Sequence, residues 1–415
     1  MRLWSGFYAN SATCVADRTV HTNTTVKKLY PLLSLCFAVN LSAQRGLPPG
    51  FKELKIGDAA PAFDLPGVDG KRYTLEHFKK PKVLMVLFTG THCPVSHAIE
   101  ERLQTLVDDM KGKDFGIVAI NPNHASGLRP DELGYTAYDE TFADSRRYAK
   151  DLGWTFPFLY DGDEQVTAKA YGCRATPHVF IFDKQRKLRY AGRFDDSRYA
   201  ILSTVKHHDT RNAIEAMLAD KPVPVAQTRP FGCSTKWKER NAHVKAEAIK
   251  WNAIPATIEE IDAQAVAKLR KNGSANVRLI NVWATWCAPC VKEFPDLTAI
   301  ASKFSRRNFE LITISLDDKK DMGKAKAFLG RHRAVISDRL RPLVKADGRT
   351  SNNYLYQGAN VDVLAEALDS KWKGSLPYSV LVNQNGKVLY RVAGMIDRDE
   401  VISKVLETIG HHYRP

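Results

Sequence analysis

Cysteine is scarce in this sequence, with seven residues among 415. That number is too small for a disulfide scaffold at this length, so structural cross-links are not the main use of these cysteines. Cys287 and Cys290 form a Cys-x-x-Cys pair, but no further Cys or His ligands lie nearby to complete a structural zinc site. No Met-rich segment supports copper handling. We therefore expect reactive thiols, no bound metal and no cofactor.

Long apolar runs and nucleic-acid motifs are missing as well. The apolar run at residues 29–39 is too short for a comfortable membrane span. Lys and Arg number 61 against 46 Asp and Glu, which gives a net charge of +15. Such an excess can attract nucleic acid, an anionic membrane surface or acidic partners. Because no element interleaves basic and aromatic residues, we expect a solvated basic surface and no nucleic-acid partner.

The first 45 residues have the layout of a secretory signal. Lys27 and Lys28 precede the apolar run, and small residues end it, so we expect cleavage after Ala43. This predicts an extracytoplasmic protein, periplasmic or secreted, whose mature chain has no stable membrane span. The first 25 residues are unusual for a signal, and an over-extended reading frame or a transit peptide are the alternatives. Export would remove Cys14 and Cys36 and leave five cysteines.

Apolar runs and amphipathic segments alternate along the rest of the chain, which predicts α/β domains with a sheet covered on both faces. The order repeats in two halves, a domain at residues 53–220 and another at 256–412, joined by a Pro-containing basic linker at 221–255. The strands expected in the two halves lie at residues 83–88, 115–120, 179–182, 187–190, 277–283, 309–315, 378–382 and 388–392. The helices expected lie at residues 96–110, 140–152, 210–218, 258–271, 287–304, 320–329, 361–368 and 397–409.

The strongest chemical signal is Trp286-Cys287-Ala288-Pro289-Cys290, which follows a predicted strand and opens a predicted helix. At a helix N-terminus the amides and the helix dipole favour a thiolate on Cys287. The motif resembles the thioredoxin active site. The longer string WCAPCVKEFP resembles the TlpA/ResA branch of that superfamily, which consists of extracytoplasmic thiol–disulfide oxidoreductases, and the resemblance covers residues 256–412. It implies that exposed Cys287 attacks a partner's disulfide and that covered Cys290 resolves the mixed disulfide.

The same resemblance assigns roles to three more residues. Glu293, one helical turn beyond Cys290, would relay protons to its sulfur; the alternative is an ordinary acid near a helix N-terminus. Pro377 would be a cis-proline lying against the disulfide, with a trans proline as the alternative. Leu376 stands where this branch usually carries Thr, a change that would alter the choice of partner.

The first half resembles the redoxin, or peroxiredoxin-like (AhpC/TSA-type), group of the thioredoxin superfamily. The strings that carry the resemblance are IGDAAPAFDL from residue 56, Thr91-His92-Cys93-Pro94, and ATPHVF from residue 175. The resemblance covers about residues 53–240, and FGCSTKW from residue 231 looks like a segment that often closes redoxin domains. It implies that Cys93 is the nucleophile and that Pro177 is a cis-proline beside it. Ser96 replaces the second cysteine of a dithiol. Val86 and Gly90 stand where a peroxiredoxin carries Pro and Thr, which argues against peroxidase activity.

A reacted Cys93 would need a resolving thiol. Cys173 lies just before the predicted cis-proline loop, so we expect it to be the nearer candidate, with Cys233 as the other. The alternative for Cys173 is a small buried hydrophobe. His92 is either a solvated loop residue or a group that lowers the pKa of Cys93.

Taken together, the residues and resemblances predict an exported protein of two tandem thioredoxin-like domains that exchanges disulfides with protein partners. Its direction is reduction, by resemblance alone, and its partners are disulfide-bearing proteins and an unidentified thiol electron donor. The alternatives are a thiol peroxidase with a fused reductant domain, a copper-binding module, and an interaction scaffold.

Overall fold

The computed structural model of the chain describes residues 47–415. The expected signal at residues 1–45, its cleavage after Ala43, and the cysteines Cys14 and Cys36 lie outside the described residues. Among residues 47–415, every helix is too short or too polar to span a lipid bilayer.

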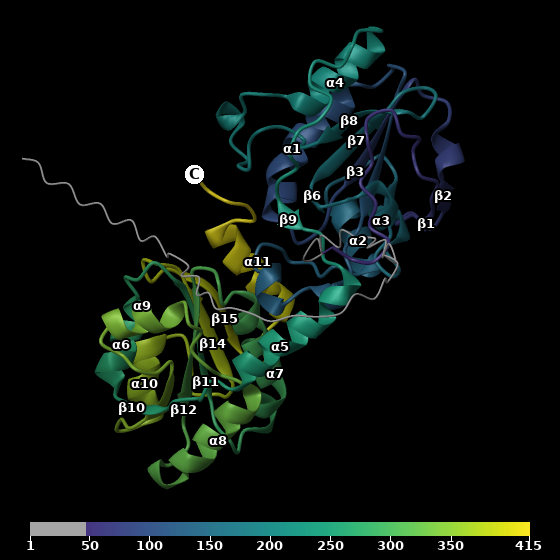
Figure 1. The fold of residues 1–415 in the computed structure, drawn as a ribbon. Helices are drawn as coiled ribbons and strands as arrows, with labels where there is room; N and C mark the ends of the chain where they lie inside the picture. Colours follow the sequence, from purple (N-terminus) through teal and green to yellow (C-terminus); the bar gives the residue numbers. More distant parts are fainter. Residues whose placement is uncertain (1–46) are drawn as a thin grey trace, which may run out of the picture. The chain divides into compact units, whose positions relative to one another are not determined.

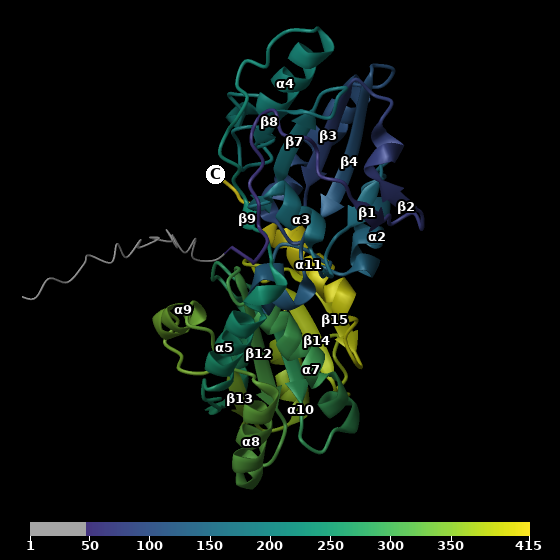
Figure 2. The same ribbon diagram turned by 45° about the vertical axis from the view of Figure 1, so that its right-hand side comes forward.

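The first half of the described chain forms a five-stranded mixed sheet in the order β5-β4-β3-β7-β8. Strand β3 pairs in parallel with β4, and β4 pairs in parallel with β5. Strand β7 runs antiparallel to β3 and to β8. Figure 1 labels β3, β7 and β8, and Figure 2 also labels β4. The bounds of the five strands are β3 (Val83–Phe88), β4 (Phe115–Asn121), β5 (Phe158–Tyr160), β7 (His178–Phe182) and β8 (Leu188–Gly192).

Helices cover both faces of this sheet. All six residues of β3 are apolar and their side chains point alternately to the two faces, so each face needs a covering layer. One set of alternate side chains packs with α1, α2 and α4, and the other set packs with α3. Full burial of each such apolar side chain contributes about 1.5–3 kcal/mol to stability. The helices are α1 (Pro94–Asp109), α2 (Phe142–Asp151), α3 (Val166–Tyr171) and α4 (Asp209–Leu218).

The second half repeats this arrangement in a six-stranded sheet of order β10-β13-β12-β11-β14-β15. Strand β11 pairs in parallel with β12 and antiparallel with β14, as β3 does with β4 and β7. The strands are β10 (Glu259–Ile261), β11 (Val277–Trp283), β12 (Phe309–Ser315), β13 (Asn353–Tyr356), β14 (Tyr378–Val382) and β15 (Val388–Ala393). The expectation of two tandem α/β units is therefore confirmed at the level of the fold.

Two apolar clusters hold the helices of this half against its sheet. Helices α7, α8 and α11 share one cluster, and α6 and α10 share the cluster on the opposite face. Figure 2 shows the sheet between these helices. Their bounds are α6 (Ala263–Lys271), α7 (Ala288–Lys303), α8 (Met322–His332), α10 (Val361–Leu368) and α11 (Arg398–Ile409).

One predicted helix is wrong at its start. Residues 258–271 were expected to be helical throughout, but Glu259–Ile261 forms the edge strand β10, which pairs in parallel with β13. The helix α6 begins only after Asp262, whose carboxylate accepts a hydrogen bond from the amide of Ala265 at 2.8 Å. Asp262 is therefore an N-cap residue, and it separates the strand from the helix.

The predicted linker at residues 221–255 is also wrong over much of its length. Gln227 forms a β-bridge with Ala191, and strand β9 (Cys233–Ser234) pairs antiparallel with β6 (Ala175–Thr176). Trp237 is only 3% exposed and packs in the first domain's apolar core. These contacts extend the first domain at least to Trp237, in agreement with the redoxin resemblance of residues 231–237 and against a linker that begins at residue 221. The helix α5 (Asn241–Asn252) follows.

Candidate active sites

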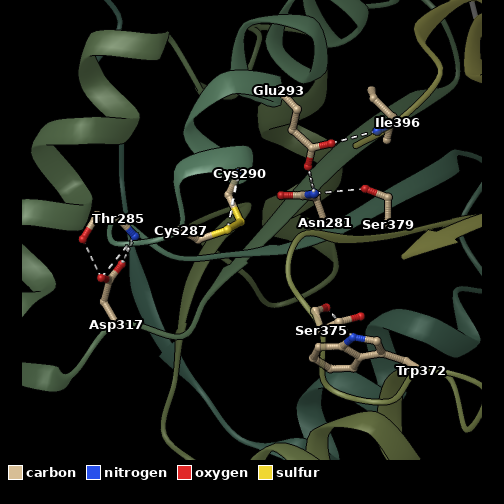
Figure 3. Close-up of a disulfide and its surroundings, with 10 residues drawn as sticks. All are labelled: Asn281, Thr285, Cys287, Cys290, Glu293, Asp317, Trp372, Ser375, Ser379 and Ile396. Atoms are coloured by element: carbon tan, nitrogen blue, oxygen red, sulfur yellow. Dashed lines mark hydrogen bonds between the residues drawn. A yellow bond between two sulfur atoms is a disulfide. The ribbon is translucent and has the colours of Figure 1, made fainter. Parts of the chain in front are cut away.

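The two cysteines of the second half lie at the junction of β11 and α7. Cys287 is the N-cap of α7, Pro289 lies in its first turn, and the amide of Cys290 donates to the Cys287 sulfur at 3.3 Å. The two residues form a disulfide with their Cα atoms 5.3 Å apart (Figure 3). The helix amides and dipole point toward the Cys287 sulfur, so a thiolate formed there on reduction is stabilised.

The two sulfurs differ in how open they are to an attacking group. Cys287 retains 6% of its surface and Cys290 retains none, while Trp286 beside them is 66% exposed. Cys287 is thus less exposed than the sequence suggested, because the disulfide itself lies against the apolar cluster of this domain. The order of exposure still leaves Cys287 as the sulfur that solvent reaches.

The loop that delivers Cys287 is fixed by Asp317, a residue that the sequence reasoning did not single out. Its carboxylate accepts hydrogen bonds from the amide of Thr285 at 3.0 Å and from the Thr285 hydroxyl at 2.6 Å. It also accepts one from the hydroxyl of Ser315 at 2.6 Å. Hydrogen bonds to a charged acceptor are the stronger ones, so this carboxylate holds the backbone just before the disulfide.

Glu293 lies one turn beyond Cys290 and is 2% exposed. Its carboxylate accepts hydrogen bonds from the side-chain amide of Asn281 at 2.8 Å and from the backbone amide of Ile396 at 2.9 Å (Figure 3). Asn281 also donates to Ser379 at 2.9 Å. Burial raises the pKa of Glu293 above its ordinary value of 4.5. The acid is therefore able to hold a proton inside the protein, although these two donors, rather than the Cys290 sulfur, are its partners among the described residues.

The peptide bond between Leu376 and Pro377 is cis, as the resemblance implied. Strand β14 begins at the next residue, Tyr378, which pairs with Val282 at the end of β11. The loop before it is held by Trp372, whose indole N–H donates to the carbonyl of Ser375 at 2.8 Å. The cis-proline loop is thus positioned by the strand that neighbours the one leading to the disulfide.

The first half places Cys93 at the equivalent junction, as the N-cap of α1 after β3. Cys93 is fully buried. Its thiol donates to the carbonyl of Thr176 at 2.8 Å. The bond between Thr176 and Pro177 is cis, as expected, and lies in the loop against this sulfur. The hydroxyl of Ser96 is buried without a hydrogen-bond partner among the described residues.

A segment far along the chain completes this site. Residues 230–235, here called the strap, include β9, in which Cys233 is the antiparallel partner of Thr176. The amide of Cys233 donates to the Cys93 sulfur at 3.4 Å. At Gly232 a Cβ atom would come within 2.0 Å of the Thr176 carbonyl oxygen. The absence of a side chain at position 232 therefore lets the strap lie directly on the cis-proline loop.

The expectation that Cys173 lies nearer to Cys93 than Cys233 does is wrong. Cys173 is fully buried, and its sulfur contacts the carbonyl of Ala175 and the hydroxyl of Thr235, both at 3.4 Å. Burial raises the pKa of its thiol to about 12. The expectation rested on the position of Cys173 just before the cis-proline loop in the sequence. In the fold, Cys173 packs into the apolar core, and the pairing of β6 with β9 brings Cys233 to Cys93.

His92 is fully buried, which excludes the solvated alternative. Its backbone amide donates to Glu140 at 3.0 Å, and its ring Nδ1 forms a close hydrogen bond with the same carboxylate. Asn121 and Asn123 donate to Glu140 at 2.6 and 3.2 Å. Burial raises the pKa of Glu140, but His92 and these donors bring it below its ordinary value. This carboxylate therefore fixes the position of His92, the residue before Cys93 in the chain.

The surroundings of the two thiols have opposite effects on them. Burial alone raises the pKa of Cys93, but the hydrogen bond from the Cys233 thiol, the charge of His92, and the amides of Cys233 and Ser96 bring it well below its ordinary value. The hydrogen bond to Cys93, together with burial, raises the pKa of Cys233 well above its ordinary value. The Thr176 carbonyl accepts a hydrogen bond from the Cys93 thiol and so favours its protonated form. This one contact is outweighed by the several groups that stabilise the thiolate.

Polar residues inside otherwise apolar strands were the signal for the positioning residues that the sequence reasoning missed. Asn281 interrupts the buried run of β11, and Asn121 ends the buried run of β4. Each donates to a buried carboxylate beside a cysteine. Among residues 47–415, no group of three or more His, Cys, Asp or Glu side chains is arranged to hold a metal ion.

Comparison with known proteins gives a family match in each half. The model described as "AhpC/TSA family" matches residues 56–191 and again residues 256–391. The chain is 27% identical over 157 residues to the thiol-disulfide oxidoreductase ResA of Bacillus thuringiensis subsp. konkukian, a match that covers 38% of this chain and 80% of that protein. It is 28% identical over 163 residues to a thiol:disulfide interchange protein DsbE homolog of Paracoccus denitrificans, covering 39% and 72%.

Among solved structures, the chain is similar to a hypothetical protein from Sinorhizobium meliloti. The two share 35% sequence identity with a TM-score of 0.40, over 45% of this chain and 97% of that one. The double family match confirms two tandem domains of the expected type. The predicted kinship with thioredoxin-like thiol–disulfide oxidoreductases is confirmed as well.

Proposed function

Because this chain belongs to the AhpC/TSA family through both of its halves, we propose that it is an exported thiol–disulfide oxidoreductase that reduces disulfides in protein partners. Cys287 and Cys290 carry the reaction, and Cys93 provides a second reactive thiol. The observation that supports this most is the Cys287–Cys290 pair at a helix N-terminus, with the cis Leu376–Pro377 loop on the neighbouring strand.

The reaction begins with the reduced pair. The Cys287 thiolate attacks one sulfur of the partner's disulfide, forms a mixed disulfide, and releases the other partner sulfur as a thiolate. Cys290 then loses its proton and attacks the Cys287 sulfur, which releases the second partner thiolate and closes the Cys287–Cys290 disulfide. An external thiol donor restores the pair, so two electrons pass from the donor to the partner.

Glu293 supports the proton transfers of this cycle. Its raised pKa and its burial suit it to take up the proton that Cys290 loses and to return it later. Asn281 and the amide of Ile396 hold the carboxylate in one orientation. We therefore assign Glu293 as the proton-relay residue of this pair, with Asn281 as the residue that positions it.

Export and the reducing direction complete the proposal. The resemblance of WCAPCVKEFP to the extracytoplasmic TlpA/ResA branch supports both. The signal-like layout of residues 1–45 supports export. Low midpoint potentials, near about −270 mV, accompany reductants of this fold, and values near about −120 mV accompany strong oxidants.

The test is reduction of insulin by the purified protein, with dithiothreitol as donor. We expect the wild type to speed precipitation of the insulin B chain, and Cys287→Ser to abolish the effect. Cys290→Ser should accumulate a mixed disulfide on Cys287 that a non-reducing gel detects. Cys173→Ala is the matched control and should behave as the wild type. Full activity of Cys287→Ser would overturn the proposal, and a potential near the oxidising end would reverse its direction.

A further inference from the structure

The N-terminal site contains two cysteines, and not only the one that the strand-to-helix junction supplies. Cys233 comes 140 residues after Cys93. Its backbone amide donates to the Cys93 sulfur at 3.4 Å, so the two residues are in direct contact. Both sulfurs lie beside the cis-proline loop, since Thr176 accepts from Cys93 and pairs with Cys233.

We propose that Cys93 and Cys233 form a second reversible disulfide in this protein, in which Cys233 is the sulfur that exchanges with external thiols. The pairing goes beyond the function proposed above, because it requires neither Cys287 nor Cys290. It gives the N-terminal domain a dithiol of its own, although position 96 holds a serine.

The fit of the strap supports this assignment. Gly232 lies at φ +151° with its Cα against Thr176, so the strap makes a contact that other residues cannot make. Behind it, the amide of Lys236 donates to Asn123 at 2.9 Å, and Trp237 is 3% exposed. The strap is therefore anchored in the core, and these contacts fix Cys233 in its position next to Cys93.

Exposure decides which sulfur meets the external thiol. Cys93 is fully buried, whereas Cys233 is partly exposed and its neighbours Gly232 and Ser234 are exposed. An external thiol that approaches the strap from solvent therefore meets Cys233 before it could meet Cys93.

An external thiolate attacks the Cys233 sulfur of the closed disulfide, forms a mixed disulfide with Cys233, and displaces the Cys93 thiolate. A second external thiolate attacks the external sulfur of that mixed disulfide and releases Cys233, which takes up a proton. Two external thiols become one disulfide, and the protein gains two electrons. The reverse sequence oxidises the protein at the expense of an external disulfide.

The surroundings of Cys93 suit it to be the leaving group. A more stabilised thiolate leaves faster from a disulfide. The amides of Cys233 and Ser96 and the charge of His92, itself held by Glu140, all stabilise that thiolate. Cys173 has no comparable contacts among residues 47–415, because its sulfur packs in the apolar core with the carbonyl of Ala175 and the hydroxyl of Thr235 as its hydrogen-bond partners.

The experiment uses the full chain with Cys287→Ser and Cys290→Ser, so that the C-terminal pair cannot contribute. The reduced protein is exposed to 2-hydroxyethyl disulfide, alkylated, and mapped by mass spectrometry without reduction. We expect the peptide of Cys93 to be joined to that of Cys233, with Cys173 alkylated only after unfolding. Adding Cys173→Ala should leave this link unchanged. Free Cys93 and Cys233, or a Cys93–Cys173 link, would overturn the pairing.

Two single variants in the same background test the direction of exchange. With Cys93→Ser, the probe should form a mixed disulfide on Cys233. With Cys233→Ser, the probe should label Cys93 about tenfold more slowly than it labels Cys233 in the Cys93→Ser variant, because a buried sulfur is poorly accessible. Equal labelling rates in folded protein would overturn the assignment of Cys233 as the entry sulfur. These results do not depend on the insulin assay, so failure of one proposal is distinguishable from failure of the other.

Discussion

Replacement of Gly232 by alanine should separate the two N-terminal sulfurs. The added Cβ would lie 2.0 Å from the carbonyl oxygen of Thr176 and 2.8 Å from its carbonyl carbon, whereas ordinary contact begins at 3.4 Å. Both neighbours are backbone atoms, so no side chain can rotate away. Relief requires the strap or the cis-proline loop to move by more than 1 Å, about the difference between 2.0 and 3.4 Å. The contact of 3.4 Å between the Cys233 amide and the Cys93 sulfur would not survive such a movement.

The magnitude can be separated into two contributions with a matched control. Gly57 also has a positive φ, +93°, but nothing lies within 4 Å of the position where its Cβ would be. Gly57→Ala should therefore lower the free energy of unfolding only by the conformational strain, about 1–2 kcal/mol. Gly232→Ala adds overpacking, a further 1–3 kcal/mol or so. We expect the difference between the two variants to reflect the clash alone.

The assay combines chemical denaturation with the mapping of disulfides. Gly232→Ala should be the less stable variant and should close the Cys93–Cys233 disulfide more slowly than the wild type. Gly57→Ala should close it at the wild-type rate. If Gly232→Ala matches Gly57→Ala in stability and closes the disulfide normally, the argument from the close approach at Thr176 is refuted.

Three further predictions concern single side chains. Burial raises the pKa of Glu293, so its contribution to stability is fully present below pH 4.5 and is lost as the pH rises through the raised pKa. Relative to the wild type, Glu293→Gln should therefore gain stability between pH 4.5 and neutrality; parallel stability curves over that range would contradict this. Asp317→Ala removes the acceptor for both Thr285 donors, so it should cost about 1.5–3 kcal/mol of stability and slow insulin reduction, because the loop before Cys287 loses its anchor. An unchanged rate of insulin reduction would show that the anchor has no catalytic effect. Cys173 has a pKa of about 12, so its thiol should resist alkylation at neutral pH in the folded protein; alkylation at the rate of an exposed thiol would contradict its burial.

The sequence predicted best where one physical signal dominated. The continuous apolar runs of β3, β11 and β12 were predicted with the observed bounds, because a strand buried on both faces has few other interpretations. The short edge strand β10 was absorbed into a helix, since three residues carry too little periodicity. The N-cap Asp262 was the available signal for that boundary.

The candidate sites followed the same rule. Cysteines at strand-to-helix junctions were predicted because the motif and its neighbours lie together in the sequence. The contact between Cys93 and Cys233 depends on the pairing of β6 with β9, whose residues are nearly sixty positions apart, and local patterns contain no trace of such a pairing. The carboxylates of Asp317 and Glu140 were missed for the same reason, since each meets its partners only after the sheet has formed.

The two cysteine pairs enclose very different lengths of chain, 3 residues in one case and 140 in the other. In the chain-entropy account, a cross-link removes more freedom from the unfolded chain as the loop lengthens, so the short ring is worth about 2 kcal/mol and the long one about 5 kcal/mol. Oxidation of the C-terminal pair would therefore raise the melting temperature less than oxidation of the N-terminal pair. Oxidation of the N-terminal pair would stabilise that domain more strongly against thermal unfolding and proteolysis. The melting temperature would therefore report whether Cys93 and Cys233 are oxidised or reduced.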